Sequence, residues 1–229
     1  MTARRLVLFD IDGTLLSTNG NGVRAMMRAY TAVWGKDPSG VDYAMSGKTE
    51  LGICYGLLAL LGFTRDEVRS GLPRFWKRYP RELRRHLSPR STTVHPGVRE
   101  LVHAVSGQPA LLLGLLTGNC EAAACVKLEV AGLDGFAVGA FGEHHEERAS
   151  LPTLAVEAAR RLTGADFRGK SIVIIGDTPN DILCGRALGV KTIAVATGRF
   201  DRESLARYDP DYLFPDLSAC GGVLEALHA

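Results

Sequence analysis

The stretch that decides the fold is Leu6-Val7-Leu8-Phe9-Asp10-Ile11-Asp12-Gly13-Thr14, an apolar run that ends on two aspartates. Carboxylates next to a buried strand are costly unless they have a partner, so this pair indicates a cation or a reaction. Side chains at positions i and i+2 of a strand point to the same side, so Asp10 and Asp12 can face one site. Gly13 lets the chain turn sharply after them. The competing interpretation is an ordinary strand followed by an Asp-Gly turn.

The composition predicts a soluble globular protein. The 229 residues suffice for one large domain or a domain with an insert, and a hydrophobic content of 46% predicts a substantial core. A formal charge of +2 does not favour nucleic acid. No apolar run reaches the about 20 residues that span a bilayer, and the start of the chain does not resemble a signal peptide. Five scattered cysteines predict reduced thiols, so we expect a cytoplasmic protein. Its oligomeric state is left open between a monomer and a homodimer.

Apolar runs that alternate with helical stretches predict an α/β fold with a parallel sheet covered by helices on both faces. The expected strands cover residues 6–9, 110–116, 172–175 and 192–196, with weaker candidates at 136–141 and 212–214. The expected helices between them cover residues 98–105, 121–130, 154–162 and 181–188.

The segment 16–90 breaks this rhythm and contains no convincing strand. It predicts three helices, 23–34, 50–61 and 65–87, with a possible break in the third at Pro73 or Pro80. Loop-like sequence flanks the segment on both sides. We therefore expect a small helical cap domain over residues 16–90, inserted into a catalytic core formed by residues 1–15 and 91–229.

Two later strands also end on polar residues. The first is followed by Thr117-Gly118-Asn119, where a hydroxyl and the free N–H groups of a helix start suit an oxyanion such as phosphate. A plain turn with Asn119 as helix cap is the alternative. The second ends in Gly176-Asp177, with Asp181 four residues later at a helix start, where a carboxylate is also a good cap.

Parallel strands direct their carboxyl ends to one edge of a sheet, and ligands bind there where the strand order reverses. We therefore expect Asp10, Asp12, Thr117 and Asp177 to meet at that edge. Carboxylates crowded together need a hard cation, and their oxygen ligands suit Mg²⁺.

This ordered set of motifs resembles the haloacid dehalogenase superfamily, and the helical insert resembles its helical-cap subgroup, which includes phosphoglycolate phosphatases and β-phosphoglucomutase. The resemblance covers essentially the whole chain. It implies that Asp10 is a nucleophile that forms an aspartyl-phosphate and that Asp12 protonates the leaving group and then activates water. It also implies that Thr117 holds phosphate. Asp177 would bind Mg²⁺ with a carboxylate oxygen of Asp10 and the backbone carbonyl of Asp12, supported by Asp181.

One residue of the family pattern is absent. Similar enzymes carry a lysine before the helix that follows the short fourth strand, whereas residues 142–152 of this chain contain none. Arg148 is the nearest match and could neutralise both phosphate and Asp10, although its planar fork donates in fixed directions. A charged surface residue is the competing interpretation.

Several other patterns carry less weight. Ser46-Gly47-Lys48-Thr49 resembles the end of a P-loop but lacks the first glycine and the preceding strand. Lys48 and Thr49 remain candidates for substrate contact in the cap, against a plain helix start capped by Thr49. His144-His145 fits no zinc spacing.

The sequence thus predicts a Mg²⁺-dependent phosphatase for a small phosphorylated metabolite, either phosphoglycolate-like or a sugar phosphate. Its predicted substrate-binding residues are Thr117, Gly118, Asn119, Lys48 and Thr49, and its predicted metal site comprises Asp10, Asp12, Asp177 and Asp181. A phosphomutase of the β-phosphoglucomutase type is the first alternative. A non-catalytic binding protein that keeps the fold is the second.

Overall fold

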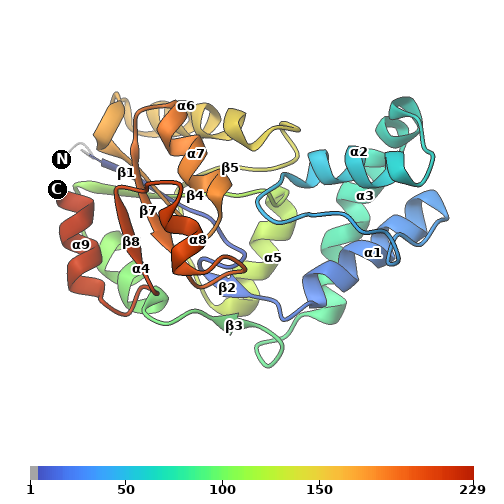
Figure 1. The fold of residues 1–229 in the computed structure, drawn as a ribbon, viewed down its shortest axis with the longest axis horizontal. Helices are drawn as coiled ribbons and strands as arrows, with labels where there is room; N and C mark the ends of the chain where they lie inside the picture. The colour runs from blue at the N-terminus through green and yellow to red at the C-terminus, as the bar shows by residue number, and fades with distance from the viewer. Residues whose placement is uncertain (1–4) are drawn as a thin grey trace.

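The computed structural model describes residues 5–229 and has a six-stranded, fully parallel sheet at its centre (Figure 1). Residues 1–4, on which the expected start of the core and the signal-peptide argument rest, lie outside the described part. The sheet has the order β5-β4-β1-β6-β7-β8. Its strands are β1 (Arg5–Phe9), β4 (Leu111–Leu116), β5 (Val138–Ala140), β6 (Ile172–Gly176), β7 (Lys191–Val195) and β8 (Tyr212–Phe214). The predicted α/β class is confirmed.

Helices cover both faces of this sheet, as the alternating apolar residues of β1 require. Val7 and Phe9 pack into the cluster that contains α4, α5 and α9, whereas Leu6 and Leu8 pack on the other face against α6 and α7. The helices of the core are α4 (Val98–Ser106), α5 (Glu121–Ala131), α6 (Leu151–Thr163), α7 (Pro179–Ala187), α8 (Arg202–Ala206) and α9 (Cys220–His228), with short 3-10 turns η1 (Arg148–Ser150) and η2 (Gly169–Ser171).

The strand order places three motifs side by side. From β1 the chain builds the sheet outward through β4 and β5, then returns to the other flank of β1 with β6. The carboxyl ends of β4, β1 and β6 are therefore adjacent, at the point where the strand order reverses. This topology brings the residues after these three strands to a single edge.

A helical block made of α1 (Asn21–Trp34), α2 (Glu50–Leu60) and α3 (Arg65–His86) lies beyond that edge (Figure 1). It has its own apolar core, in which the Phe75 ring stacks on the Tyr30 and Tyr79 rings at centroid distances of 4.8 and 5.6 Å. Cys120 and Ala123 of α5 belong to the same cluster, so the block also packs directly against the helix that follows β4.

Two expectations about this block are wrong. Helix α3 runs unbroken through Pro73 and Pro80, although each proline removes a backbone donor. The buried aromatic face of α3 supplies packing that outweighs this loss, and a capping box of Thr64 and Glu67 fixes its start. The segment 16–90 also contains a strand, because β2 (Leu16–Ser17) pairs antiparallel with β3 (Thr93–Val94). This ribbon ties the entry and exit of the block together.

Candidate active site

Three aspartates form a buried cluster at the carboxyl ends of the central strands. Asp10 follows β1, Asp177 follows β6 and Asp181 lies in the first turn of α7; each is less than 5% exposed. One carboxylate oxygen from each lies within 4.8 Å of the others. Burial and mutual repulsion raise the pKa of Asp10 to about 6, against the attraction of Arg148, and raise the pKa of Asp177 well above its usual value. The cluster thus has the character of a cation site.

Arg148 is buried between two of these aspartates. Its Nη2 atom lies 3.0 Å from Oδ2 of Asp10 and 2.6 Å from Oδ1 of Asp181, and it also donates to the carbonyl of Leu116 at 3.3 Å. Residue 148 begins η1, which leads into α6 on the face of the sheet that Leu8 and Asp10 share. The position is not a charged surface residue, because its side chain is only 5% exposed.

The backbone approaches the Asp177 side chain closely at two glycines, which fixes the orientation of its carboxylate. Thr14 donates a hydrogen bond to Oδ1 of Asp177 at 2.9 Å. A Cβ atom on Gly13, which has φ of 85°, would lie 2.4 Å from Oδ2 of Asp177, and one on Gly198 would lie 1.7 Å from it. Gly198 was not predicted, because nothing in the sequence connects the loop after β7 with the end of β6.

Asp12 has different partners from the cluster. Its Oδ2 accepts hydrogen bonds from Nζ of Lys127 at 2.6 Å and from Nδ2 of Asn119 at 2.7 Å, and Lys127 also donates to Oδ1 of Asn119 at 2.5 Å. Its side chain is not among the clustered carboxylates, so its predicted metal contact is limited to its backbone carbonyl. Sequence reasoning missed Lys127, for which the only signal was a lysine among the small apolar residues of α5.

The predicted phosphate-binding turn lies beside this pair. Thr117 is fully buried, and its Oγ1 accepts from the side-chain amide of Asn119 at 2.8 Å. Asn119 is not the cap of α5, because Cys120 occupies that position. Gly118 passes so close to the cap that a Cβ atom there would lie 2.1 Å from the carbonyl oxygen of Lys48.

Backbone hydrogen bonds hold the start of α2 against the core. The N–H of Glu50 donates to the carbonyl of Gly118 at 2.7 Å, and the N–H of Leu51 donates to the carbonyl of Gly142 at 3.1 Å. Thr49 caps α2 through Gly52 N–H, and its hydroxyl donates to the carbonyl of Glu146 at 2.6 Å. The Thr49 hydroxyl is therefore already engaged in capping α2 and in holding it against the core, so a substrate contact would have to replace one of these bonds.

A cavity of about 360 Å³ lies between the core and the helical block. The residues that line it come from both parts and include Asp10, Asp12, Lys48, Glu50, Tyr79, Gly118, Asn119, Lys127, Arg148 and Arg199. The ammonium of Lys48 is 4.0 Å from the centroid of the Tyr43 ring. Thr49 does not border this cavity within the residues 5–229 that the structure describes.

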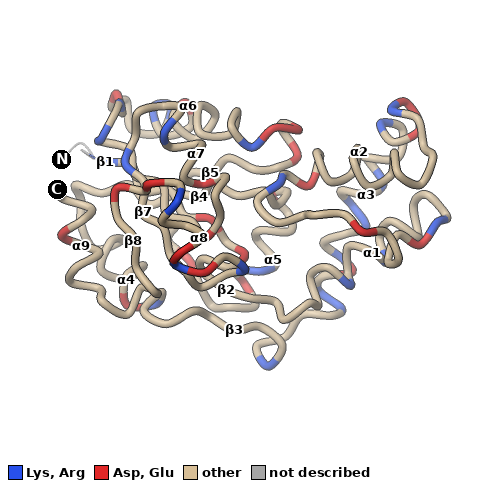
Figure 2. The backbone as a smooth tube through the Cα atoms, in the orientation of Figure 1, with Lys and Arg blue, Asp and Glu red and all other residues tan. Residues whose placement is uncertain are grey.

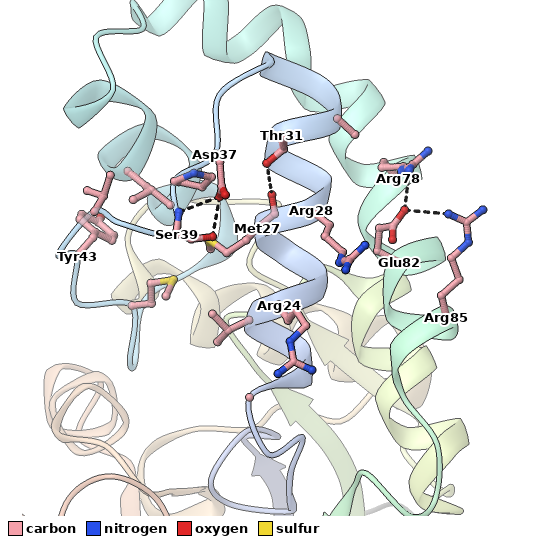
Figure 3. A pocket seen from close by; sticks show the side chains of 17 residues that line it. Arg24, Met27, Arg28, Thr31, Asp37, Ser39, Tyr43, Arg78, Glu82 and Arg85 are labelled. Atoms are coloured by element: carbon pink, nitrogen blue, oxygen red, sulfur yellow. Dashed lines mark hydrogen bonds and ion pairs between the residues drawn. The ribbon is translucent and has the colours of Figure 1, made fainter.

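A larger hollow of about 790 Å³ lies in the helical block and is lined mainly by residues of α1, α3 and the segment 37–45 (Figure 3). Arg24 and Arg28 reach it from α1, and Arg78 and Arg85 from α3, where both pair with the buried carboxylate of Glu82 (Figure 3). It does not border the aspartate cluster, so we place the chemistry in the smaller cavity.

Elsewhere, charges of both signs are interspersed along the backbone (Figure 2).

The chain resembles known proteins over most of its length. Residues 149–220 match the family model described as HAD-hydrolase-like. A probable phosphatase, IndB, of Dickeya dadantii is 27% identical over 97% of this chain and 94% of its own, and a phosphoglycolate phosphatase of Chromobacterium violaceum is 28% identical over 88% and 89%. Pyrophosphatase PpaX of Halalkalibacterium halodurans is 26% identical over 95% and 96%.

Solved structures share the fold. A β-phosphoglucomutase of Clostridium difficile superposes with a TM-score of 0.72 at 14% identity, covering 99% of this chain and 97% of its own. A hydrolase of Pseudomonas syringae gives 0.69 at 20% identity, covering 98% of each chain.

The chain is similar to haloacid dehalogenase-like hydrolases, as the motifs predicted. Within that class it is an enzyme of the phosphatase type. Within residues 5–229, no helix combines the length and apolar character that a bilayer crossing requires.

Proposed function

We propose that the chain is a Mg²⁺-dependent phosphatase that hydrolyses a small phosphorylated metabolite through an aspartyl-phosphate on Asp10. One observation carries the proposal: Asp10 and Asp12 follow the same strand but differ in their surroundings. Asp10 belongs to the buried cluster with Arg148, whereas Asp12 contacts Lys127 and Asn119 at the cavity. Different surroundings are how two carboxylates take different roles in one reaction.

The reaction has two steps. A carboxylate oxygen of Asp10 attacks phosphorus, the bond from phosphorus to the leaving oxygen breaks, and Asp12 gives a proton to that oxygen. Asp12 then takes a proton from water, whose oxygen attacks the phosphorus and releases inorganic phosphate with the original Asp10 carboxylate. A covalent intermediate of this kind divides one difficult step into two. General acid and base catalysis by a carboxylate contributes about 10²–10⁴-fold.

Positive charge has to offset the repulsion between a carboxylate and a phosphate dianion. The guanidinium of Arg148 contacts the carboxylate of Asp10, and Thr117 provides a buried hydroxyl for phosphate oxygens. The donor set fits a divalent cation, because the three clustered aspartates and Asp12 bring four carboxyl groups together with only two cationic side chains, Arg148 and Lys127. We propose Asp10, Asp177, Asp181 and the carbonyl of Asp12 as its holders. Bound there, Mg²⁺ would lower the charge repulsion and orient phosphate.

We further propose that residues 16–90 act as a cap and that residues 1–15 and 91–229 act as the catalytic core. The bonds from Glu50 and Leu51 to Gly118 and Gly142 support this division, because they would restrict water at the cavity when formed. A phosphomutase is the second candidate, because it also needs a cavity from which water is restricted. Product analysis separates the two, since a phosphatase releases inorganic phosphate and a mutase returns an isomeric phosphate ester.

Hydrolysis of 4-nitrophenyl phosphate tests the proposal. We expect Mg²⁺-dependent turnover in the wild type and a fall of at least about 10³-fold in Asp10→Asn, because the amide is not a nucleophile. Asp134→Asn, which changes an exposed loop residue, serves as the matched control and should keep full activity. Equal activity of Asp10→Asn and wild type, or no Asp10-dependent turnover with any divalent cation, would favour a non-catalytic protein.

A further inference from the structure

Glu50 is a buried acid of the helical block that the proposed reaction does not use. It is the first residue of α2 and only 3% exposed. Its Oε2 accepts a hydrogen bond from the backbone N–H of Cys120 at 2.8 Å, which places the carboxylate next to Asn119, a partner of Asp12. Glu50 also lines the cavity that contains Asp10 and Asp12.

The second oxygen of this carboxylate has no partner. Oε1 of Glu50 is buried and forms no hydrogen bond with any of the described residues. Tyr79 borders the same cavity, and burial together with the interaction of its hydroxyl with the Glu50 carboxylate raises the pKa of Tyr79, but this hydroxyl forms no hydrogen bond with Oε1. Leaving a buried acceptor unpaired costs about 1–3 kcal/mol, and more if it is charged. Because Glu50 lines the cavity, a ligand that brings a donor to its carboxylate would satisfy this acceptor.

The neighbours of Glu50 restrict which donor fits. A second carboxylate or phosphate on the ligand would bring another negative charge next to the carboxyl groups of Glu50 and Asp12, which repel it when they are ionised. An ammonium group on the ligand would be repelled by the like charge of Lys127. The Nζ atom of Lys127 lies 2.6 Å from Asp12, and its charge also acts on Glu50. A hydroxyl group carries no charge and can donate to Oε1.

We propose that Glu50 is a specificity-determining residue and that the substrate is a phosphate monoester whose carbon skeleton carries a free hydroxyl that donates to Oε1 of Glu50. This inference rests on the proposed phosphatase function and narrows it: sugar or polyol phosphates are substrates, and phosphoglycolate-like esters with a carboxylate are discriminated against. The cavity of about 360 Å³ limits the ester to a small molecule.

Three small esters that differ in one group test the proposal: 2-hydroxyethyl phosphate, propyl phosphate and phosphoglycolate. At pH 8, above the Glu50 pKa of about 7, phosphate release by the wild type should give a kcat/KM that is about 10- to 100-fold higher for the hydroxyl ester than for propyl phosphate, the range of one hydrogen bond to a charged group. Phosphoglycolate should be the poorest of the three. In Glu50→Gln the preference for the hydroxyl ester over propyl phosphate should shrink, and phosphoglycolate should gain relative to both.

Two further variants keep the test decisive. Glu82→Gln removes a buried carboxylate of the helical block that does not border the cavity, and it should keep the wild-type order of substrates. Glu50→Asp keeps the charge but withdraws it by one methylene, so it replaces Glu50→Gln if that variant does not fold and should also lose preference.

The outcomes separate the two levels of inference. Asp10-dependent hydrolysis of 4-nitrophenyl phosphate without a hydroxyl preference in the wild type would overturn the role of Glu50 and leave the phosphatase intact. An unchanged preference in both Glu50 variants would do the same. Absence of any Asp10-dependent hydrolysis would overturn both proposals.

Discussion

We expect Arg148 to act where similar enzymes carry a lysine, and its buried position between two aspartates fits this expectation. A single guanidinium nitrogen, Nη2, contacts Asp10 at 3.0 Å and Asp181 at 2.6 Å, so one donor group bridges the two carboxylates. A lysine ammonium, which is a compact point charge with three donors, could make the same two contacts. The aspartates around Arg148 raise its pKa above the usual value and outweigh its burial, so it stays charged at any physiological pH.

Replacing Arg148 tests this assignment. We expect Arg148→Ala to lower kcat by about 100-fold or more, because a donor to the developing charge is lost. It should also destabilise the protein by about 3–5 kcal/mol, since two buried carboxylates lose their partner. Thermal unfolding and phosphate release measure the two effects. Arg148→Lys should fold and retain part of the activity; near-normal turnover in folded Arg148→Ala would contradict the role.

The sequence predicted the residues that follow strands, and Asp181 four residues beyond one, but it missed Lys127 and the role proposed for Glu50. Asp10, Thr117 and Asp177 could be found because each ends an apolar run, and parallel strands share an edge. Lys127 and Glu50 could not, because each lies within or at the start of a helix with no motif, 115 and 38 positions away from Asp12. Only the packing of α2 and α5 shows that both residues border the same cavity.

At the scale of elements, close backbone contacts hold the start of α2 against the core. Three glycines make this fit possible. A Cβ atom on Gly118 would lie 2.1 Å from the carbonyl of Lys48, one on Gly142 would lie 1.9 Å from the carbonyl of Gly118, and one on Gly47 would lie 2.8 Å from Nδ2 of Asn180. Asn180 in turn donates to the carbonyl of Gly47 at 2.8 Å. The docking of α2 on the core therefore depends on these glycines, because a side chain at any of the three positions would push the two backbone segments apart.

Gly142→Ala should loosen this docking without disturbing the aspartates. The new methyl group would displace Gly118 and weaken the bond from the N–H of Leu51 to the carbonyl of Gly142. We expect KM to rise about 10-fold, a loss comparable to one hydrogen bond, with faster hydrogen exchange at the amides of Glu50 and Leu51. Gly40→Ala, where a Cβ atom meets nothing within 4 Å, is the matched control. Unchanged exchange at Glu50 in Gly142→Ala would argue against docking through this contact.

Long elements could be predicted from the sequence, whereas the short ones that connect the two parts could not. The limits of α1 and α2 fall within two residues of expectation, because apolar periodicity extends over several turns. The β2–β3 ribbon consists of two residues in each strand, far too few for any pattern. The continuity of α3 was missed for a different reason: local rules for proline do not include the aromatic packing that holds Phe75 and Tyr79 in place.

For the molecule as a whole, the site sets stability against function. Asp10, Asp177 and Asp181 are buried together at the sheet edge, and Glu50 is buried on the facing helix. Burial is the main reason that the pKa of Asp10 rises to about 6 and that of Glu50 to about 7. Like charges brought together in the folded chain favour protonation, and a bound cation would reverse that preference. The fold therefore holds carboxylates that are costly without their ligand.

This balance predicts how stability depends on pH and metal. A carboxyl whose pKa is higher in the folded than in the unfolded chain binds more protons when folded, so its contribution is greatest below the unfolded pKa and falls as pH rises through the folded one. For Asp10 this window runs from about 4 to about 6, and the loss is on the order of 3 kcal/mol. Without metal, the wild type should therefore lose stability relative to Asp10→Asn as pH rises from 4 to 7.

Mg²⁺ should restore that loss, because the cation competes with protons for the same oxygens. We expect the rise in Tm on adding MgCl₂ in place of a chelator to be small at pH 5, larger at pH 8, and strongly reduced in Asp10→Asn at both. Thermal unfolding of the two proteins at these pH values, with and without the metal, measures all three. A rise in Tm that is equal at pH 5 and pH 8, or equal in Asp10→Asn and wild type, would show that Mg²⁺ binds elsewhere. The proton and the cation would then not compete at Asp10, and the costly burial of these aspartates would need another ligand to explain it.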